Sequence, residues 1–172
     1  PTTHSVPEAS FLIMKSSFGV ILHTGDFKID KKPLLENPLD YSKLENALGG
    51  RPSLCVVDST NMLNENKGMS ETLLKEPIAK IIEESKGRVI FTSFASNLGR
   101  LKIIAEAGEK SGRSIAVFGR AMNNMLSKAL ETSIFTDFPT LIDPRKAHLL
   151  PRENLLVIAT GSQGEIRAAS AQ

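Results

Sequence analysis

The sequence contains very few of the residues that form disulfide bonds or large aromatic contacts in small proteins. It has one cysteine, Cys55, no tryptophan and one tyrosine in 172 residues. A single cysteine excludes an internal disulfide framework and is typical of a reducing compartment. Apolar runs such as Phe11–Met14 and Leu155–Ala159 are far too short to span a bilayer, and no basic-then-apolar leader opens the sequence. We therefore expect a cytoplasmic protein with no membrane partner.

An initiator methionine is also absent. The first residue is Pro1, in a segment that looks like a loop, and we expect a fragment of a longer protein. With 41% hydrophobic and 23% charged residues, the chain has an ordinary globular composition. Its length suits one domain and part of another, and it can bury a hydrophobic core.

Basic residues are concentrated in the middle of the chain, although the net charge is only +2. Seven basic and two acidic residues lie between residues 86 and 120, which gives a local excess of five positive charges. Such a cluster is most often a solvated helix face, and a phosphate-bearing partner is the competing interpretation. The basic residues are Lys86, Arg88, Arg100, Lys102, Lys110, Arg113 and Arg120.

The N-terminal part predicts a β-hairpin followed by a connector. Apolar runs at Phe11–Met14 and Val20–Leu22 flank a turn that contains glycine. The proline-rich segment after Lys28 has one short helical stretch, at about Tyr41–Leu48. We predict a first domain at residues 1–45 and a second at residues 46–172.

The second part alternates short apolar runs with segments of helical spacing, which predicts an α/β fold. The expected architecture is a parallel, Rossmann-like sheet covered by helices on both faces. The predicted strands are Leu54–Asp58, Val89–Thr92, Ile115–Phe118 and Leu155–Ala159. The predicted helices run from about Met69 to Ser85, from about Leu98 to Ser111, and onward from near Arg120.

Local signals place the ends of two of these helices. Ser70 is the expected N-cap of the first helix, and Pro77 marks either a kink or a later start. Gly112 is the expected residue just past the end of the second helix. The segment Thr132–Arg152, which contains His148, gives no clear pattern.

In an open parallel sheet, ligands bind beyond the carboxyl ends of the strands. Four polar segments follow the predicted strands, and we expect them to share one edge: Asp58–Asn61, Ser93–Asn97, Gly119–Arg120 and Thr160–Glu165. The last suits a phosphate best, because its glycines permit close backbone approach, although a lone loop of this kind is more often a simple turn. Asn61 and Asn97 are more typical of turns or helix caps than of a ligand site. Arg100 and Arg120 have a simpler interpretation as surface residues, but an arginine near a phosphate loop suits bidentate phosphate recognition.

A second group of candidate residues lies in the hairpin. His4 precedes one strand and Asp26 follows the next, so imidazole and carboxylate could reach a common zinc or manganese ion. His23 could orient such a ligand through a hydrogen bond. Spacing alone favours the simpler interpretations, with His4 as a disordered terminal residue and Asp26 as a turn residue after Gly25.

These segments resemble a known family. Thr3–Ala9 and His23–Lys28 resemble the third and fourth metal-binding motifs of the metallo-β-lactamase superfamily, in its ribonuclease J-like branch. Four further segments resemble, in order, the β-CASP domain of that family: Val57–Asn61, Phe94–Asn97, Phe118–Arg120 and Thr160–Glu165. The resemblance implies a hairpin remnant of the metallo-β-lactamase fold before a β-CASP domain that is incomplete at its C-terminal end.

The resemblance implies a metal-dependent ribonuclease that hydrolyses RNA phosphodiester bonds in RNA processing and decay, by 5′–3′ exonucleolytic and endonucleolytic cutting. It assigns His4 and Asp26 to a site for two zinc ions, with manganese or magnesium as alternatives, and Asp26 and Asp58 to catalysis. A homodimer or homotetramer is implied for the full-length protein. The expected RNA contacts are Ser96, Asn97, Arg100, Arg120, Thr160, Gly161, Ser162, Gln163, Gly164 and Glu165.

The sequence also departs from the family pattern. The His-x-His-x-Asp-His motif and the later histidine motifs are missing, so we expect no tight metal binding and no nuclease activity in this chain. Gly99 stands where a histidine is common, and Ile166 where proline is frequent. Two alternatives remain. One is a nucleotide or sugar-phosphate module, although Asp58–Asn61 lacks the glycine fingerprint, and the other is a non-catalytic interaction domain.

Overall fold

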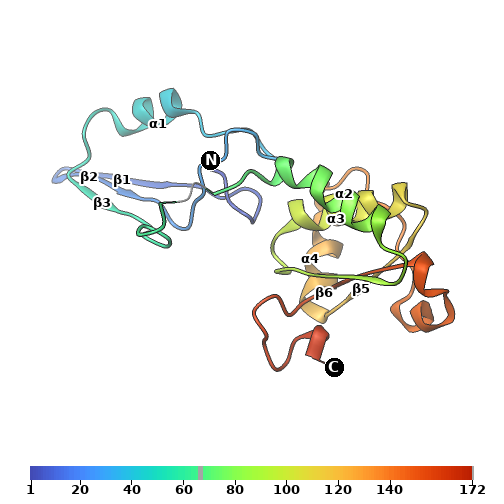
Figure 1. Cartoon of the computed structure of the whole chain (residues 1–172). Coiled ribbons are helices and arrows are strands. Elements are labelled where there is room, and N and C mark those ends of the chain that lie inside the picture. Colours follow the sequence, from blue (N-terminus) through green and yellow to red (C-terminus); the bar gives the residue numbers. More distant parts are fainter. Residues whose placement is uncertain (66–67, 172) are drawn as a thin grey trace. The chain divides into compact units, whose positions relative to one another are not determined.

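The computed structural model describes residues 1–65 and 68–171. The chain forms two compact units, Pro1–Ser70 and Glu71–Gln172. Each unit contains one three-stranded sheet (Figure 1). The units divide after Ser70, later in the chain than the boundary at residue 45 that the sequence predicts. The domain boundaries in the family sense stay a prediction.

The first unit is built on the predicted hairpin, which is confirmed. Strands β1 (Leu12–Ser16) and β2 (Gly19–His23) are antiparallel, with Ser16 opposite Gly19 across a tight turn. Strand β3 (Leu54–Val56) lies parallel to β2, with Ile21 opposite Leu54. The sheet order is therefore β1-β2-β3.

The position of β3 corrects one prediction. The sequence assigns Leu54–Asp58 to the parallel sheet of the second domain, and this is wrong, because β3 pairs with the hairpin. A run of apolar residues identifies a strand but not its partner. The connection between β2 and β3 contains helix α1 (Tyr41–Leu48), and parallel neighbours require a crossover of this kind. Helix α1 lies where the sequence predicts it.

Hydrogen bonds hold the first unit together more than an apolar core does. Its strands leave Leu12, Met14, Leu54 and Val56 exposed. Helix α1 buries no residue. Among the described residues of this unit, those that are buried are polar, namely Thr2, Thr3, Thr24 and Asp30. Directional hydrogen bonds therefore fix the loops at the strand ends.

The second unit contains the predicted parallel sheet. Strands β4 (Val89–Thr92), β5 (Ser114–Phe118) and β6 (Leu155–Ala159) are all parallel, in the order β4-β6-β5. The last strand in sequence is thus the central one, and all five of its residues are buried. A single parallel bridge joins Ile115 to Leu141 beside β5. The α/β class and the parallel sheet are confirmed.

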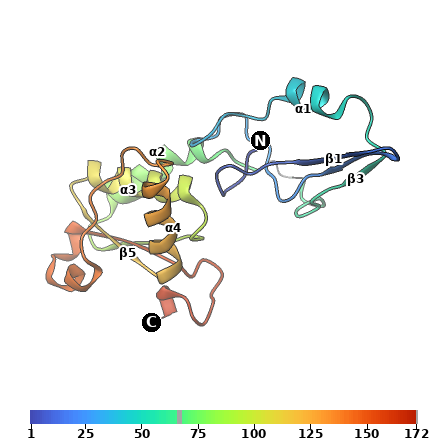
Figure 2. The same ribbon diagram turned by 180° about the vertical axis from the view of Figure 1, so that it is seen from behind.

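Helices cover one face of this sheet. A 3-10 turn, η1 (Glu71–Leu74), leads into α2 (Lys75–Glu84), which packs on α3 (Leu98–Lys110). Both helices lie on the same side of β5 and β6 in Figures 1 and 2. Helix α4 (Arg120–Glu131) follows β5 and contacts it. Among the described residues, no helix is long and apolar enough to cross a bilayer.

The opposite face is covered by short segments rather than by long helices. Its core consists of Ala116, Leu155, Val157 and Ala159 with Ala147. Ala147 belongs to the 3-10 helix η2 (Pro144–Leu149), and η3 (Arg152–Asn154) leads from there into β6. The chain after β6 ends in η4 (Ala169–Ala171), on the side away from α2 and α3 (Figures 1 and 2).

Two of the three predicted helix-end signals are confirmed. Gly112 has a φ of 69° and ends α3, with the Gly112 N–H bonded to the Glu109 carbonyl and the Arg113 N–H to the Gly108 carbonyl, both at 2.9 Å. Pro77 lies in the first turn of α2, where its missing N–H breaks no helical bond. Ser70 is not an N-cap, because η1 separates it from α2.

Candidate functional site

The loops after β2 and β3 share one edge of the first unit's sheet, because the two strands are parallel. Thr24 follows β2, and its N–H donates to the Val56 carbonyl at 3.0 Å. The Asp58 N–H in turn donates to the Thr24 hydroxyl at 3.0 Å. The candidate carboxylates Asp26 and Asp58 therefore follow neighbouring strands at the same edge, whereas the sequence pattern predicts Asp58 at the end of a strand in the other sheet.

The Asp58 carboxylate is stabilised in its ionised form. The Thr60 N–H donates to Oδ1 of Asp58 at 2.8 Å. The Thr60 N–H and hydroxyl hold the pKa of Asp58 below its usual value, and the Phe27 N–H and the charge of His4 act in the same direction. His4 is therefore within electrostatic reach of Asp58. An ionised carboxylate of this kind suits a metal ligand or a base better than an acid.

The segment that carries His4 is fixed rather than free. Thr3, its neighbour, is buried, and its carbonyl accepts the Lys28 N–H at 2.7 Å. The Thr3 hydroxyl donates to the Lys28 carbonyl and accepts the Asp30 N–H at 3.1 Å. The His4 N–H lies 3.3 Å from Oε1 of Glu36. The simpler interpretation of His4 as a loose terminal residue is therefore wrong.

His23 bonds to the turn that carries Asp26. Its Nδ1 accepts the Gly25 N–H at 3.0 Å, and its side chain is exposed. Asp26 is exposed as well. The ring of His23 is thus oriented by the backbone beside Asp26, and a role in orienting a metal ligand stays a prediction.

The donor types at this edge suit a metal ion, but their number does not. His4, Asp26 and Asp58 offer imidazole and carboxylate groups, which are ligands for zinc and manganese. Within residues 1–65 and 68–171, no three histidine, cysteine, aspartate or glutamate side chains come together closely enough to hold a metal ion. The described residues alone do not fit a complete metal centre.

In the second unit, three strand exits, meaning the segments that directly follow the strands, meet at one edge of the sheet. The strands β4, β5 and β6 are parallel, so the segments after Thr92, Phe118 and Ala159 emerge together. The exits after β5 and β6 are in direct contact, since a Cβ on Gly119 would lie 2.8 Å from Oγ1 of Thr160. The sequence predicts four exits at this edge. The fourth, Asp58–Asn61, belongs to the other unit.

The loop Thr160–Glu165 is closed by its first residue. The Thr160 hydroxyl accepts the Ala169 N–H and its carbonyl accepts the Ser170 N–H, both at 3.1 Å. Gly161 has a φ of 123°, and a Cβ there would lie 1.7 Å from Oγ of Ser170. The loop must therefore keep glycine at this position to fold back on itself.

The tip of this loop faces solvent. Ser162, Gln163, Gly164 and Glu165 are all exposed. The Gln163 N–H donates to Oε2 of Glu165 at 3.1 Å, so this acidic side chain occupies one of the backbone donors. The remaining exposed amides and hydroxyls are groups that bind phosphate oxygens in other loops of this type.

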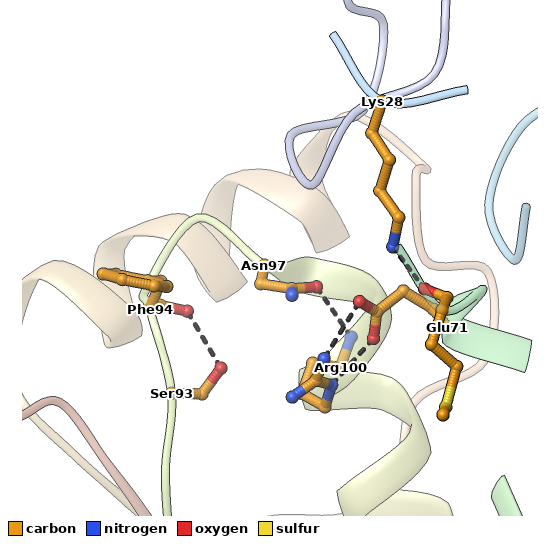
Figure 3. Close-up of polar contacts among 7 residues, drawn as sticks. Lys28, Glu71, Ser93, Phe94, Asn97 and Arg100 are labelled. Atoms are coloured by element: carbon orange, nitrogen blue, oxygen red, sulfur yellow. Dashed lines mark hydrogen bonds and ion pairs between the residues drawn. The ribbon is translucent and has the colours of Figure 1, made fainter. Parts of the chain in front are cut away.

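The exit after β4 has a structural role at two of its predicted contact residues. Asn97 is buried and is the N-cap of α3, where its Oδ1 accepts the Arg100 N–H at 3.0 Å. The Arg100 guanidinium faces Glu71, with Nε 2.7 Å from Oε2 (Figure 3). Ser96, which precedes the cap, is half-buried. The simpler interpretation of Asn97 as a cap thus matches the geometry.

Two further members of the basic cluster hold the structure together. Lys102 Nζ lies 2.7 Å from Oδ1 of Asp137. Arg113 is buried, and its Nη1 donates to the Gly87 carbonyl at 2.7 Å while Nη2 bonds to the carbonyls of Ile82 and Ser85. Arg113 therefore caps the C-terminal end of α2. For these two residues the interpretation as a solvated helix face is wrong, because their cationic groups are bonded within the fold.

The remaining basic residues of the cluster lie at different edges. Lys86 and Arg88 precede β4 and Lys110 ends α3, so they lie toward the amino edge of the parallel strands. Arg120, at the start of α4, is exposed at the carboxyl edge. Arg167, which the sequence motifs do not single out, is exposed after the Thr160–Glu165 loop. Its position shortly after a strand-exit loop is the signal that could have identified it.

Known proteins match this chain over nearly its whole length. The model of the ribonuclease J β-CASP domain matches residues 86–172. Ribonuclease J of Sinorhizobium meliloti is 38% identical over 98% of this chain, and ribonuclease J 1 of Streptococcus pyogenes is 42% identical over 99% of it. The chain spans 30% of the length of each of these two relatives.

A solved structure supports the fold. A protein of unknown function from Enterococcus faecalis V583 aligns with 95% of this chain and 41% of its own length, with a TM-score of 0.58. At 16% identity this likeness concerns the fold alone. Together with the β-CASP model, which covers half of the sequence, and the two ribonuclease J relatives, the arrangement of strand exits leads to one conclusion: the chain belongs to the ribonuclease J family and contains its β-CASP domain.

Proposed function

We propose that this chain is the RNA-holding part of a ribonuclease, and that the complete protein hydrolyses RNA phosphodiester bonds. The observation that carries the proposal is the carboxyl edge of the second sheet. There, the Thr160 side chain packs against Gly119, residues 162–165 of the following loop are exposed, and Arg120 and Arg167 are exposed. Backbone donors and arginines are the groups that bind RNA phosphates.

For the first unit, we propose that His4 and Asp26 contribute to a metal site that further ligands complete in the longer protein. Zinc is the proposed ion, with manganese or magnesium as alternatives. When bound, such an ion lowers the pKa of a coordinated water and neutralises phosphate charge. Asp58 would stay ionised beside His4, because the Thr60 N–H and hydroxyl lower the pKa of its carboxyl. His23 would keep the Asp26 turn in place through the Gly25 N–H.

The finer features of the function are proposals for the complete protein. They are 5′–3′ exonucleolytic and endonucleolytic cutting, action in the cytoplasm, and assembly as a homodimer or homotetramer. The resemblance of the strand-exit motifs to the family supports the two modes of cutting. For this chain alone we propose no nuclease activity, since its described donors are too few for a metal centre.

A nuclease assay tests the proposal that this chain alone has no nuclease activity. The chain is incubated with 5′-monophosphorylated RNA and excess zinc or manganese, beside an Asp26→Ala variant prepared in the same way. We expect no turnover from either protein. Turnover that the Asp26→Ala variant loses would contradict the proposal, because it would mean that the residues present suffice for a working site.

Competition experiments separate RNA holding from the two alternatives. Labelled single-stranded RNA is bound to the chain, and unlabelled RNA or free nucleotides are added. An RNA-holding edge predicts displacement by unlabelled RNA and little effect of mononucleotides at the same phosphate concentration. Displacement by mononucleotides would favour a nucleotide-binding module. Absence of RNA binding would favour a non-catalytic interaction domain.

A further inference from the structure

Three threonines are buried in the first unit, and their hydroxyl groups differ in one respect. Thr2, Thr3 and Thr24 are all at most 5% exposed. The hydroxyls of Thr3 and Thr24 each donate one hydrogen bond to a backbone carbonyl and accept one from a backbone N–H. The Thr2 hydroxyl has no hydrogen-bond partner in the part of the chain that the structure describes.

The bonds of Thr24 join the two strand exits. Its N–H bonds to the Val56 carbonyl at 3.0 Å, its hydroxyl donates to the Gly25 carbonyl at 2.8 Å, and the same hydroxyl accepts the Asp58 N–H at 3.0 Å. One side chain therefore connects the turn before Asp26 with the backbone of Asp58.

The bonds of Thr3 join the segment of His4 to the segment after Asp26. Its carbonyl and its hydroxyl both bond to the backbone of Lys28, and the hydroxyl also accepts the Asp30 N–H at 3.1 Å. Thr3 immediately precedes His4, so little freedom remains for the backbone of that residue. Together, Thr3 and Thr24 connect the segments that carry His4, Asp26 and Asp58.

We infer that Thr3 and Thr24 are positioning residues for the candidate metal ligands, an inference that rests on the proposed function. No residue of these strands is buried, and Leu12, Met14, Leu54 and Val56 are exposed, so packing alone does not fix the three segments. A buried hydroxyl that both donates and accepts fixes two backbone segments at once, and removing it takes away the partner of a backbone N–H. Neither threonine touches substrate or metal in this role.

The chain offers a matched set of variants. Thr3→Val and Thr24→Val keep the side-chain shape and remove the hydroxyl, whereas Thr3→Ser and Thr24→Ser keep the hydroxyl. Thr2→Val is the control, because it removes a buried hydroxyl that has no partner among the described residues. Urea unfolding of every variant separates local effects from loss of the fold.

The first measurement is amide hydrogen exchange, which needs no metal. We expect exchange at the Asp58 N–H to become about tenfold faster or more in Thr24→Val, matching the loss of one hydrogen bond of about 1.4 kcal/mol. The Thr24 N–H, bonded to Val56, should keep its protection. Thr24→Ser and Thr2→Val should resemble the unmodified chain. An unchanged Asp58 exchange rate in a folded Thr24→Val variant would overturn the inference.

The second measurement is broadening of the NMR signals of His4 and Asp26 by Mn²⁺ alone. We expect weak, site-specific broadening that falls several-fold in both valine variants and returns in both serine variants. Equal broadening in folded valine variants would overturn the positioning role but leave the proposed metal residues standing. No selective broadening in the unmodified chain would contradict the proposed metal residues themselves, and with them this inference.

Discussion

The Arg100 guanidinium and the Glu71 carboxylate form a two-point ion pair, with Nε 2.7 Å from Oε2 and Nη2 3.0 Å from Oε1. The pair joins η1 to the first turn of α3, at the point where the second unit begins. The planar fork of Arg100 is the part of the side chain that would bind a phosphate, and Glu71 already occupies it. Arg100 therefore contributes to the fold, and its guanidinium is already engaged by a carboxylate.

We predict that Arg100→Met lowers the free energy of unfolding by about 1–2 kcal/mol, because Arg100 and Glu71 form a bidentate ion pair that is only partly exposed. Urea unfolding of Arg100→Met, Glu71→Gln and the double variant measures the coupling between the two residues. The salt dependence of RNA binding should not change in Arg100→Met. A weaker salt dependence with unchanged stability would mean that Arg100 contacts phosphate instead.

Gly108 allows α3 to approach the central strand. A Cβ at this position would lie 2.3 Å from Cδ2 of Leu156, which is fully buried and has little room to move. Alanine is the better helix former by about 1 kcal/mol, but overpacking a tight core costs roughly 1–3 kcal/mol. We therefore predict that Gly108→Ala lowers the melting temperature.

Gly87→Ala is the control for this prediction, because a Cβ there meets nothing within 4 Å. Thermal unfolding of the two variants should show a loss of stability for Gly108→Ala alone. A Gly108→Ala variant as stable as Gly87→Ala would contradict a close approach of α3 to β6 at Gly108.

The contact between Lys102 and Asp137 predicts two limits of pH stability. The Lys102 hydrogen bond holds the pKa of Asp137 below its ordinary value of 3.8. Burial lowers the pKa of Lys102, but the hydrogen bonds to Asp137 and Glu106 outweigh burial and raise it above 10.5. The stabilisation by Asp137 is present above pH 3.8 and is lost as pH falls through its folded pKa. The stabilisation by Lys102 is lost as pH rises through the folded pKa of Lys102.

We therefore predict that Asp137→Asn lowers stability at neutral pH and makes stability fall less steeply below about pH 4. Urea unfolding at acidic and neutral pH measures both effects. Glu109→Gln serves as the control, since this residue is exposed at the end of α3. If stability fell as steeply at acidic pH in Asp137→Asn as in the unmodified chain, Asp137 would be excluded as the cause of that fall.

The sequence predicts most elements but not all of their partners. The spacing of apolar residues places α3, β4 and β6 within a residue of their observed bounds and gives the start of α4. It fails for β3, because an apolar run of three or four residues fits any sheet, and pairing depends on contacts far apart in sequence. The covering of one sheet face by η2 was also not predictable, since Thr132–Arg152 has no periodicity.

For the candidate site too, the sequence predicts some features and not others. Motif position directs attention to the segments around His4, Asp26 and Thr160, and the roles of these residues stay predictions. It does not reveal that Arg113 caps α2 or that Thr24 accepts the Asp58 N–H, because both roles depend on distant backbone atoms. Residue type alone cannot separate an arginine that caps a helix from one that is exposed for a ligand.

The most direct test of RNA holding is the salt dependence of affinity for a fluorescent single-stranded RNA, measured by anisotropy between about 50 and 200 mM salt. We predict a steep dependence, and Arg120→Gln and Arg167→Gln should each reduce its slope by about 1. Arg88→Gln, before β4, should leave the slope unchanged. A slope that Arg120→Gln and Arg167→Gln do not alter, or that Arg88→Gln reduces equally, would contradict RNA holding at the carboxyl edge of the second sheet.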